Sequence, residues 1–328
     1  MIVVTGGAGF IGSNLVAALT ERGAGDVVVC DWLGCGEKWQ NLAKHEISDL
    51  VAPEDLLAFL DAHEGRIQAI FHLGAITSTT EADVDLLMRN NFGLSRSLWN
   101  WCANARVRFL YASSAATYGD GGHGFDDDGS VAALARLRPL NAYGWSKHLF
   151  DRRVARAVMA GGTHPPQWAG LKFFNVYGPN EYHKGPMKSV VAQVYADMAA
   201  GLPATLFRSH HPDYADGGQL RDFVWVGDCV QVMLWLLDNR EVSGLFNLGT
   251  GAARSFKDLA TAVAHAIGRE ADIRYIDIPN EIRARYQYFT QASMTRLHAA
   301  GYTAPFTSLE HGITRYVRDY LATPDPYR

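Results

Sequence analysis

The sequence predicts an α/β fold, with a doubly wound parallel sheet and a smaller mixed α/β lobe. Short runs of apolar and β-branched residues alternate with longer segments in which apolar residues return every three or four positions. The short runs are almost continuously apolar, which indicates strands that are buried on both faces. We expect strands at residues 2–5, 27–31, 69–73, 109–113, 171–175 and 245–248, and helices at residues 10–22, 53–62, 84–103, 143–160 and 228–238.

A glycine-rich turn joins the first expected strand to the first expected helix. Gly6, Gly9 and Gly12 recur in the segment Thr5-Gly-Gly-Ala-Gly-Phe-Ile-Gly12. In this context the spacing is typical of a Rossmann-type dinucleotide site, where glycines permit a tight turn, backbone contact with a pyrophosphate and close helix packing. A tight turn without a ligand is the alternative, but the flanking strand and helix favour binding.

The glycine turn and the order of the elements predict two domains. Residues 1–174 and 224–251 are expected to form a dinucleotide-binding Rossmann domain. Residues 175–223 and 252–328 are expected to form the smaller substrate-binding lobe. In that lobe, Ser255 and Asp258 have the spacing of a capping box and predict the start of a helix.

The end of the second expected strand bears on the choice between NAD and NADP. Asp31 stands where an acidic side chain commonly holds the ribose diol of NAD. Trp32 could stack on adenine, however, and Lys38 could pair with the 2′-phosphate of NADP while Asp31 turns aside. These residues alone leave both cofactors open.

Tyr143 and Lys147 are the strongest candidates for chemistry. They lie four positions apart in an expected helix and therefore share one face. We expect the ammonium, together with a charged nicotinamide ring, to lower the phenol pKa from its usual value of about 10. Tyr143 would then be a general base for a sugar hydroxyl. A pair at this spacing also arises by chance, so the neighbouring motifs must decide.

The bulk composition is that of a globular enzyme and excludes several other classes. Of 328 residues, 48% are hydrophobic, and a net charge of −4 without a basic run argues against nucleic-acid binding. The four cysteines form no Cys-x-x-Cys pair, which indicates reduced thiols. No secretory leader pattern and no apolar run near about 18 residues is visible, so we expect a cytoplasmic protein without a membrane span.

Two loops, residues 120–138 and 209–219, stand out between the periodic segments. The second contains His210, His211 and Asp213, which invite comparison with a metal site. Adjacent side chains rarely converge on one ion, and no further ligand set is visible in the sequence. We therefore expect a solvated loop and no metal.

Several segments resemble the extended short-chain dehydrogenase/reductase family and, more narrowly, its ADP-L-glycero-D-manno-heptose 6-epimerases. The motifs His183-Lys184-Gly185 and 285–291 are the narrowest of these. The Pro179 and Gly251 motifs recur across the wider family. The resembling segments are 71–75, 78–81, 109–119, 174–179, 183–185, 221–223, 246–251 and 285–291.

The resemblance implies an epimerase that inverts C6″ of ADP-D-glycero-D-manno-heptose or ADP-L-glycero-D-manno-heptose by oxidation and re-reduction, for lipopolysaccharide core heptose. Tyr143 and Lys184 match the pair of acid/base residues, Ser114 the residue that binds the reacting oxygen, and Lys147 the residue that holds the nicotinamide ribose. It also implies tightly held NADP, with NAD as the alternative, and a homo-oligomer, often a pentamer in the family.

The resemblance extends to binding residues. Those for the cofactor are Gly6, Gly9, Phe10, Ile11, Gly12, Asp31, Trp32, Lys38, Leu73, Gly74, Ala75, Ile76, Thr77, Asn90, Lys147 and Val176. Those for the nucleotide sugar are Ser114, Asn175, Lys184, Pro186, Gln193, Phe207, Arg208, Ser209, His210, Arg221 and Tyr286. Arg221 suits a pyrophosphate because guanidinium donates two parallel hydrogen bonds; a salt bridge with Asp222 or Asp228 is its alternative.

Four positions depart from the heptose-epimerase pattern. Leu73, Pro53, Pro186 and Gln193 stand where the family usually has Glu, Lys, Ser and His. The loop at residues 209–219 is also longer than the pattern. These departures leave the sugar and the cofactor phosphate open, but they do not affect the hydride chemistry.

Other functions remain alternatives. A dehydratase is disfavoured because Ala115 and Ala116 occupy the places of the acid pair that expels water. A UDP-hexose 4-epimerase shares Ser114, Tyr143 and Lys147 without needing Lys184, and it is the runner-up. A non-catalytic NADP-binding sensor keeps the fold but has no need of these side chains.

Overall fold

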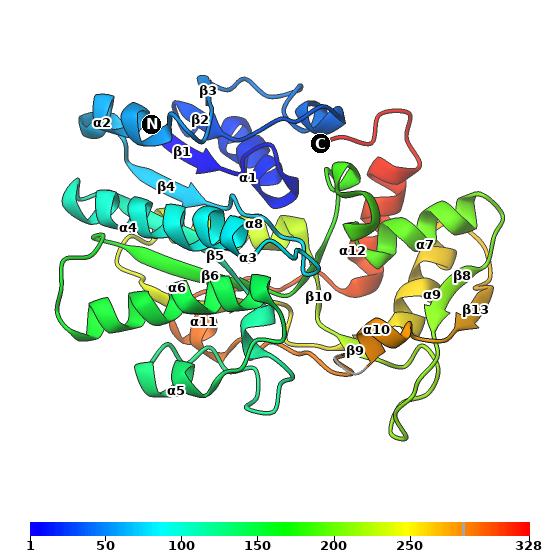
Figure 1. Ribbon diagram of the computed structural model, residues 1–328. Coiled ribbons are helices and arrows are strands. Elements are labelled where there is room, and N and C mark those ends of the chain that lie inside the picture. Colours follow the sequence, from blue (N-terminus) through cyan, green and yellow to red (C-terminus); the bar gives the residue numbers. More distant parts are fainter. Residues whose placement is uncertain (284–285) are drawn as a thin grey trace.

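The computed structural model describes residues 1–283 and 286–328, and its centre is a seven-stranded sheet with the order β11-β6-β5-β4-β1-β2-β3 (Figure 1). All neighbouring strands in this sheet are parallel. The predicted doubly wound sheet is therefore confirmed. Its strands are β1 Ile2–Thr5, β2 Val27–Cys30, β3 Asp49–Val51, β4 Ala69–His72, β5 Arg108–Ser114, β6 Trp168–Phe173 and β11 Gly244–Leu248.

Helices cover both faces of the sheet (Figure 1). On one face α1 packs against α8, and on the other α4 and α6 lie on β5. The chain leaves β1 toward one edge of the sheet and β4 toward the other, so a crevice opens at the carboxyl ends of these two adjacent strands. These helices are α1 Phe10–Glu21, α2 Leu56–Ala62, α3 Val84–Leu87, α4 Leu94–Asn104, α5 Val131–Arg136, α6 Ala142–Met159, α8 Val226–Asp238 and α11 Thr295–Ala299.

The helix expected at residues 84–103 is confirmed, but it is not α-helical throughout. A π-helical turn, Met88–Gly93, lies between α3 and α4. The interruption coincides with Asn91, whose buried amide accepts from the Ile76 N–H (2.8 Å) and donates to the Ile76 carbonyl (2.9 Å). Such turns frequently occur at functional sites. Hydrophobic periodicity carries no information about these two hydrogen bonds of the Asn91 side chain.

Other boundaries also differ from the expectations. The helix expected from residue 53 begins at Leu56, after a turn. The strand expected at 171–175 ends at Phe173, and the chain then enters β7 Asn175–Tyr177, which pairs with β10 Phe223–Trp225. Strand β3 was not predicted because it is short and two of its three residues are exposed.

A second hydrophobic cluster lies beside the main one. Helices α7, α9 and α12 and the strand pair β8–β13 build it, and Ser255 caps α9 with the predicted capping box. Met294, Leu297 and Tyr302 pack into the main cluster instead, and the predicted domain boundaries stay a prediction. The remaining elements are α7 Val190–Ala199, β8 Ala204–Phe207, β9 Leu220–Arg221, β12 Arg254–Ser255, α9 Phe256–Ala266, β13 Ile273–Ile276, α10 Asn280–Arg283 and α12 Leu309–Tyr316.

No helix in the two described ranges combines the length and the apolar character needed to cross a membrane.

The close approach of α1 to the glycine turn generates a first prediction. A Cβ at Gly12 would lie 2.1 Å from the Gly6 carbonyl oxygen. We expect Gly12→Ala to lower the free energy of unfolding by about 1–3 kcal/mol, because backbone must shift to relieve the overlap. Chemical denaturation measures the change. Gly65→Ala is the matched control, since a Cβ there meets nothing within 4 Å; equal stability of the two variants would contradict the prediction.

Candidate active site

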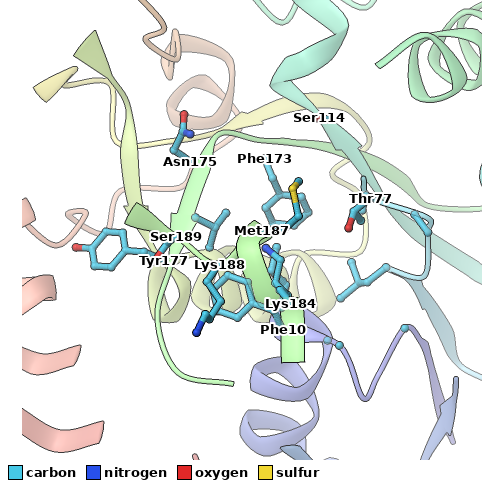
Figure 2. Close-up of a pocket in the computed structure, with 18 of the residues that line it drawn as sticks. Phe10, Thr77, Ser114, Phe173, Asn175, Tyr177, Lys184, Met187, Lys188 and Ser189 are labelled. Carbon is cyan, nitrogen blue, oxygen red and sulfur yellow. The ribbon is translucent and has the colours of Figure 1, made fainter. Parts of the chain in front are cut away.

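A cavity of about 480 Å³ opens at the crevice of the sheet and reaches toward the second hydrophobic cluster (Figure 2). Most of its wall comes from residues that the sequence singled out, contributed by segments far apart in the chain. Those residues are Gly6, Gly9, Phe10, Ile11, Gly12, Asp31, Lys38, Leu73, Gly74, Ala75, Thr77, Ser114, Tyr143, Lys147, Asn175, Val176 and Lys184.

The N-terminus of α1 points into this cavity. Gly9 caps the helix without a side-chain hydrogen bond, and the first N–H groups of a helix have no partner within it. Gly6 holds φ at +66°, a backbone conformation that suits glycine. Uncapped N–H groups and the positive end of the helix dipole fit a pyrophosphate, so the residues present suit a dinucleotide.

Asp31 and Lys38 form an ion pair at the edge of the cavity. Lys38 Nζ lies 2.7 Å from Asp31 Oδ1, while the Ala8 N–H donates to Asp31 Oδ2 at 3.0 Å. Asp31 is therefore turned toward the glycine loop and its charge is neutralised. Trp32 lies outside the cavity wall, where its indole N–H donates to Glu54.

Tyr143 and Lys147 stand at the start of α6, where Asn141 caps the helix through the Gly144 N–H. Burial raises the pKa of Tyr143, and the interaction with the Ser114 side chain lowers it in part. Lys147 Nζ donates to the Ala112 carbonyl at 2.9 Å. Without a cofactor, burial therefore decides the direction of the Tyr143 shift, and the lowering expected from Lys147 together with a charged nicotinamide ring stays a prediction.

Burial also acts on Lys147. It lowers the pKa of this ammonium to about 8, and the negative charge of Asp151 opposes the change. At pH 7 Lys147 is therefore still mostly protonated, although its pKa lies only about one unit above that pH. The spacing of Tyr143 and Lys147 predicted a shared cavity, but it did not indicate where the ammonium would point.

Lys184 enters the cavity from the turn Tyr182–Met187 (Figure 2). Its Nζ lies 5.3 Å from the centre of the Phe10 ring. Burial lowers the pKa of Lys184, and the nearby Glu181 carboxylate opposes this shift. Tyr143 and Lys184 therefore line one cavity from two separate elements, although their roles stay predictions.

Glu181 is a buried side chain that the sequence analysis did not single out. Its carboxylate accepts from the Ser189 hydroxyl at 2.6 Å and from the Tyr316 hydroxyl at 3.0 Å. These contacts tie the turn that carries Lys184 to α7 and α12. The neighbouring His183 has its pKa lowered to about 4, mainly by burial, so its imidazole is neutral near pH 7.

Arg221 belongs to a cluster next to the cavity. Its guanidinium lies 5.3 Å from the centre of the Tyr286 ring and 5.7 Å from that of Phe256, and Phe256 itself lines the cavity. Arg221 also donates to the carbonyls of Leu220 and Gln287. Phe207 packs edge-on against Tyr286.

The alternative salt bridges of Arg221 do not form within the described ranges. Asp222 accepts from the Thr250 and Gly251 N–H groups instead. Asp228 accepts from Thr307. Arg285, part of a narrow motif, lies outside the described residues.

The other predicted binding residues lie off the cavity wall: Trp32, Ile76, Asn90, Pro186, Gln193, Phe207, Arg208, Ser209, His210, Arg221 and Tyr286. Asn90 donates to the Leu86 carbonyl at 2.9 Å. Gln193 donates to the carbonyls of Pro186 (3.3 Å) and Lys188 (2.7 Å). The side-chain amides of Asn90 and Gln193 therefore donate to backbone carbonyls.

Further wall residues were not predicted. Several are apolar and carry no motif, so pattern reasoning had no signal for them, whereas Lys188 follows Lys184 closely and is a recognisable polar candidate. The additional residues are Ala112, Ser113, Phe173, Phe174, Tyr177, His183, Met187, Lys188, Ser189, Val190, Val191, Phe223, Phe256 and Leu259.

The two histidines of the loop at residues 209–219 form only long ion pairs with aspartates. His210 Nε2 lies 3.7 Å from Asp277, and His211 Nδ1 lies 3.8 Å from Asp213. Among the residues of the described ranges, no three His, Cys, Asp or Glu side chains gather closely enough to hold a metal ion.

The model of the NAD dependent epimerase/dehydratase family matches residues 2–249. The chain belongs to this family. Membership confirms the family resemblance found in the sequence and supports a nicotinamide cofactor. It accounts for the pairing of the glycine loop with Tyr143 and Lys147 in one cavity.

Relatives within the family are similar over their whole length. Proteins named ADP-L-glycero-D-manno-heptose-6-epimerase from two strains of Nitratidesulfovibrio vulgaris are each 51% identical to this chain, and the match covers 100% of this chain and 100% of each relative. One of the same name from Fusobacterium nucleatum is 45% identical over 100% of both chains.

Two solved structures have folds similar to that of this chain. The ADP-L-glycero-D-manno-heptose-6-epimerase of Helicobacter pylori has a TM-score of 0.79 at 28% identity, covering 97% of this chain and 95% of that chain. The UDP-glucose 4-epimerase of Thermus thermophilus, solved with NAD, has a TM-score of 0.75 at 28% identity, covering 95% and 96%.

The low pKa of Lys147 predicts a change of stability with pH. Between about 8 and about 10.4, its usual value when unfolded, the unfolded chain holds a proton that the folded chain has released. The free energy of unfolding should therefore rise with pH in this window, by up to about 1.4 kcal/mol per pH unit, relative to Lys147→Met. Urea denaturation of both proteins at several pH values measures this difference. Parallel pH curves would rule it out.

Proposed function

We propose that this family member interconverts ADP-D-glycero-D-manno-heptose and ADP-L-glycero-D-manno-heptose at C6″, by oxidation and re-reduction with a bound nicotinamide cofactor. The single observation that carries the proposal is that Tyr143 and Lys184 line one cavity together with the glycine loop. Relatives of that name, 51% identical over their full length, support the choice of substrate.

Inversion of a stereocentre calls for acid/base groups on different sides of the reacting carbon. Tyr143 projects from α6 and Lys184 from the turn Tyr182–Met187, so each serves one orientation of the sugar. Burial lowers the pKa of Lys184, which eases proton release near neutral pH. Ser114, which interacts with Tyr143, binds the reacting oxygen in this mechanism.

The glycine loop and the N-terminus of α1 would hold the pyrophosphate of the cofactor, and Lys147 would hold its nicotinamide ribose. A bound oxidised nicotinamide would supply the hydride acceptor for C6″ and a positive charge that favours the Tyr143 phenolate.

The nucleotide diphosphate of the substrate is proposed to rest on the cluster around Arg221. This guanidinium is buried and fixed by the Tyr286 and Phe256 rings, so it is pre-organised for an anion. The other proposed substrate residues are Asn175, Pro186, Gln193, Phe207, Arg208, Ser209 and His210. We further propose heptose supply for the lipopolysaccharide core as the cellular role, and a homo-oligomeric assembly.

Incubation with ADP-D-glycero-D-manno-heptose tests the reaction. The purified protein should convert it to a mixture of the two stereoisomers, separable by chromatography. Tyr143→Phe and Lys184→Met should each lower the rate by about 100- to 10,000-fold, because each removes one proton carrier.

Matched controls are Tyr195→Phe on α7 and Lys257→Met on α9, which lie outside the cavity wall and should retain the parent rate. Turnover of UDP-glucose to UDP-galactose without action on the heptose would support a 4-epimerase instead. A bound cofactor without turnover of either sugar would support the sensor alternative. Parent-like activity of Lys184→Met would exclude the paired acid/base mechanism.

NADP is the proposed cofactor, because Lys38 has already neutralised Asp31 and offers a cation at the cavity edge. The nucleotide released from the purified protein by denaturation should be NADP on mass spectrometry. Lys38→Ala should favour NAD by about tenfold or more in a reconstitution assay, since the unscreened Asp31 carboxylate repels a 2′-phosphate. Release of NAD alone would overturn this assignment.

A further inference from the structure

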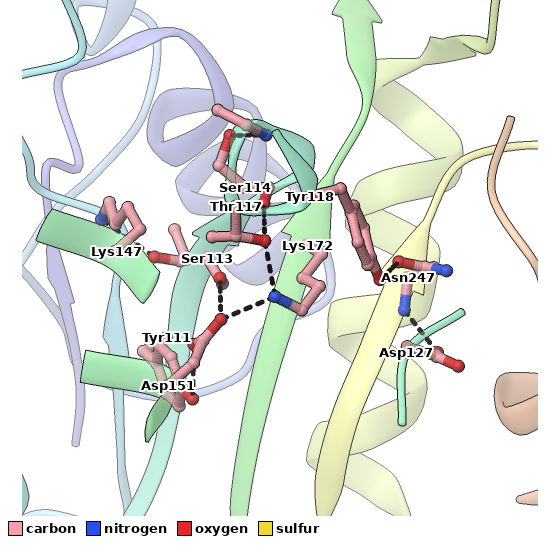
Figure 3. A network of polar contacts seen from close by, with 12 residues as sticks. Tyr111, Ser113, Ser114, Thr117, Tyr118, Asp127, Lys147, Asp151, Lys172 and Asn247 are labelled. Atoms are coloured by element: carbon pink, nitrogen blue, oxygen red, sulfur yellow. Dashed lines mark hydrogen bonds and ion pairs between the residues drawn. The ribbon is translucent and has the colours of Figure 1, made fainter. Parts of the chain in front are cut away.

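A buried ion pair, which the mechanism above does not use, lies behind the candidate active site (Figure 3). It joins Asp151 on α6 to Lys172 on β6, with 2.7 Å between Nζ and Oδ2. Both side chains are at most 1% exposed. Ser113 donates to Asp151 Oδ2 at 2.7 Å and Tyr111 donates to Oδ1 at 3.1 Å, so both carboxylate oxygens are satisfied.

One arm of this network reaches the active site along α6. Tyr143, Lys147 and Asp151 follow one another at four-residue spacing and therefore share one stripe of the helix. The ion pair thus anchors, on β5 and β6, the same helix face that presents the two candidate catalytic side chains. The charge of Asp151 also raises the pKa of Lys147 against the effect of burial.

The other arm runs through Thr117. Lys172 Nζ donates to the Thr117 hydroxyl at 2.7 Å, and that hydroxyl donates to the Ser114 carbonyl at 2.8 Å. The Ser114 side chain interacts in turn with Tyr143. The hydrogen bonds therefore connect the ion pair through Thr117 to Ser114, and α6 connects it to Tyr143, which lines the same cavity as Ser114.

Stability alone is a weak reason for such a pair. Apolar residues of similar volume often replace a buried ion pair without loss of stability, because desolvation offsets the attraction of the charges. Proton transfer is far more demanding, since a displacement of about 1 Å can lower a rate by about 100-fold. A fully bonded pair that fixes one helix to two strands meets that demand.

We propose that Asp151 and Lys172 are positioning residues that set Ser114 against Tyr143. The inference rests on the epimerase function proposed above. Neither side chain lines the cavity, so neither touches the substrate. Their effect should appear in the rate of the chemical step and not in substrate binding.

The test uses the double variant Asp151→Asn/Lys172→Met, because either single exchange would leave a buried charge unpaired. Asn retains an acceptor oxygen for one of the Tyr111 and Ser113 hydroxyls, and its NH2 group can donate to the other. Met retains the aliphatic stem of Lys172. We expect kcat to fall about 10- to 100-fold, while KM for ADP-heptose changes less than about threefold. The alkaline limb of the kcat–pH profile should move to lower pH, since Lys147 loses the Asp151 charge that raises its pKa, and loss of the Lys172 charge offsets this only in part. His72, which also faces Lys147, stays neutral because burial lowers its pKa to about 3.

Thr117→Val is the second variant, because it breaks the arm to Ser114, keeps the ion pair and nearly preserves shape. It should lower kcat about three- to tenfold with KM unchanged. Asp228→Asn on α8 is the matched control: this half-buried carboxylate lies off the cavity wall and accepts from the N–H and hydroxyl of Thr307. It should lower the melting temperature but keep the kcat and pH profile of the parent.

Each outcome decides between the proposals. Parent-like kcat and pH profile in a folded double variant would overturn the positioning role. If the double variant does not fold, a parent-like kcat of Thr117→Val would overturn it. If the parent protein does not act on ADP-heptose, the proposed function fails, and the same variants are then compared on UDP-glucose.

Discussion

The close contact between α1 and the glycine turn sets the geometry of the molecule. Because Gly12 has no Cβ, the helix packs onto the Gly6 carbonyl and its first N–H groups stay at the carboxyl edge of β1. Neighbouring contacts depend on that placement. The Ala8 N–H binds Asp31, and the Gly74 N–H reaches the Thr5 hydroxyl at 3.1 Å. Backbone contacts thus define the crevice between β1 and β4, independently of the reactive side chains that line it.

Burial is the main cause of the pKa shifts of the candidate catalytic side chains in the cavity. It raises the pKa of Tyr143 and lowers those of Lys147 and Lys184, so it favours the neutral form of all three groups. Each lysine has a buried carboxylate that opposes this effect, Asp151 for Lys147 and Glu181 for Lys184. In each case a buried carboxylate thus partly preserves the charged form of the lysine against burial.

Much of this arrangement could be predicted from the sequence. Apolar runs and helical periodicity predicted the strands of the main sheet except β3, and the glycine turn predicted the crevice. The break in the helix at Asn91 could not be predicted, because it reflects an amide clamp on a distant backbone segment. The direction of the Lys147 ammonium could not be predicted for a related reason: spacing gives the helix face, whereas the Ala112 carbonyl decides where the ammonium lies.

The amide of Gln193 shows how a departure from a family pattern can be read. Its Nε2 donates hydrogen bonds to two carbonyls in the segment that follows Lys184, those of Pro186 and Lys188. A side chain bonded in this way braces the loop that follows Lys184. Gln in place of the family's usual His at position 193 therefore acts first on the shape of this loop, and through that shape on the room left for the sugar.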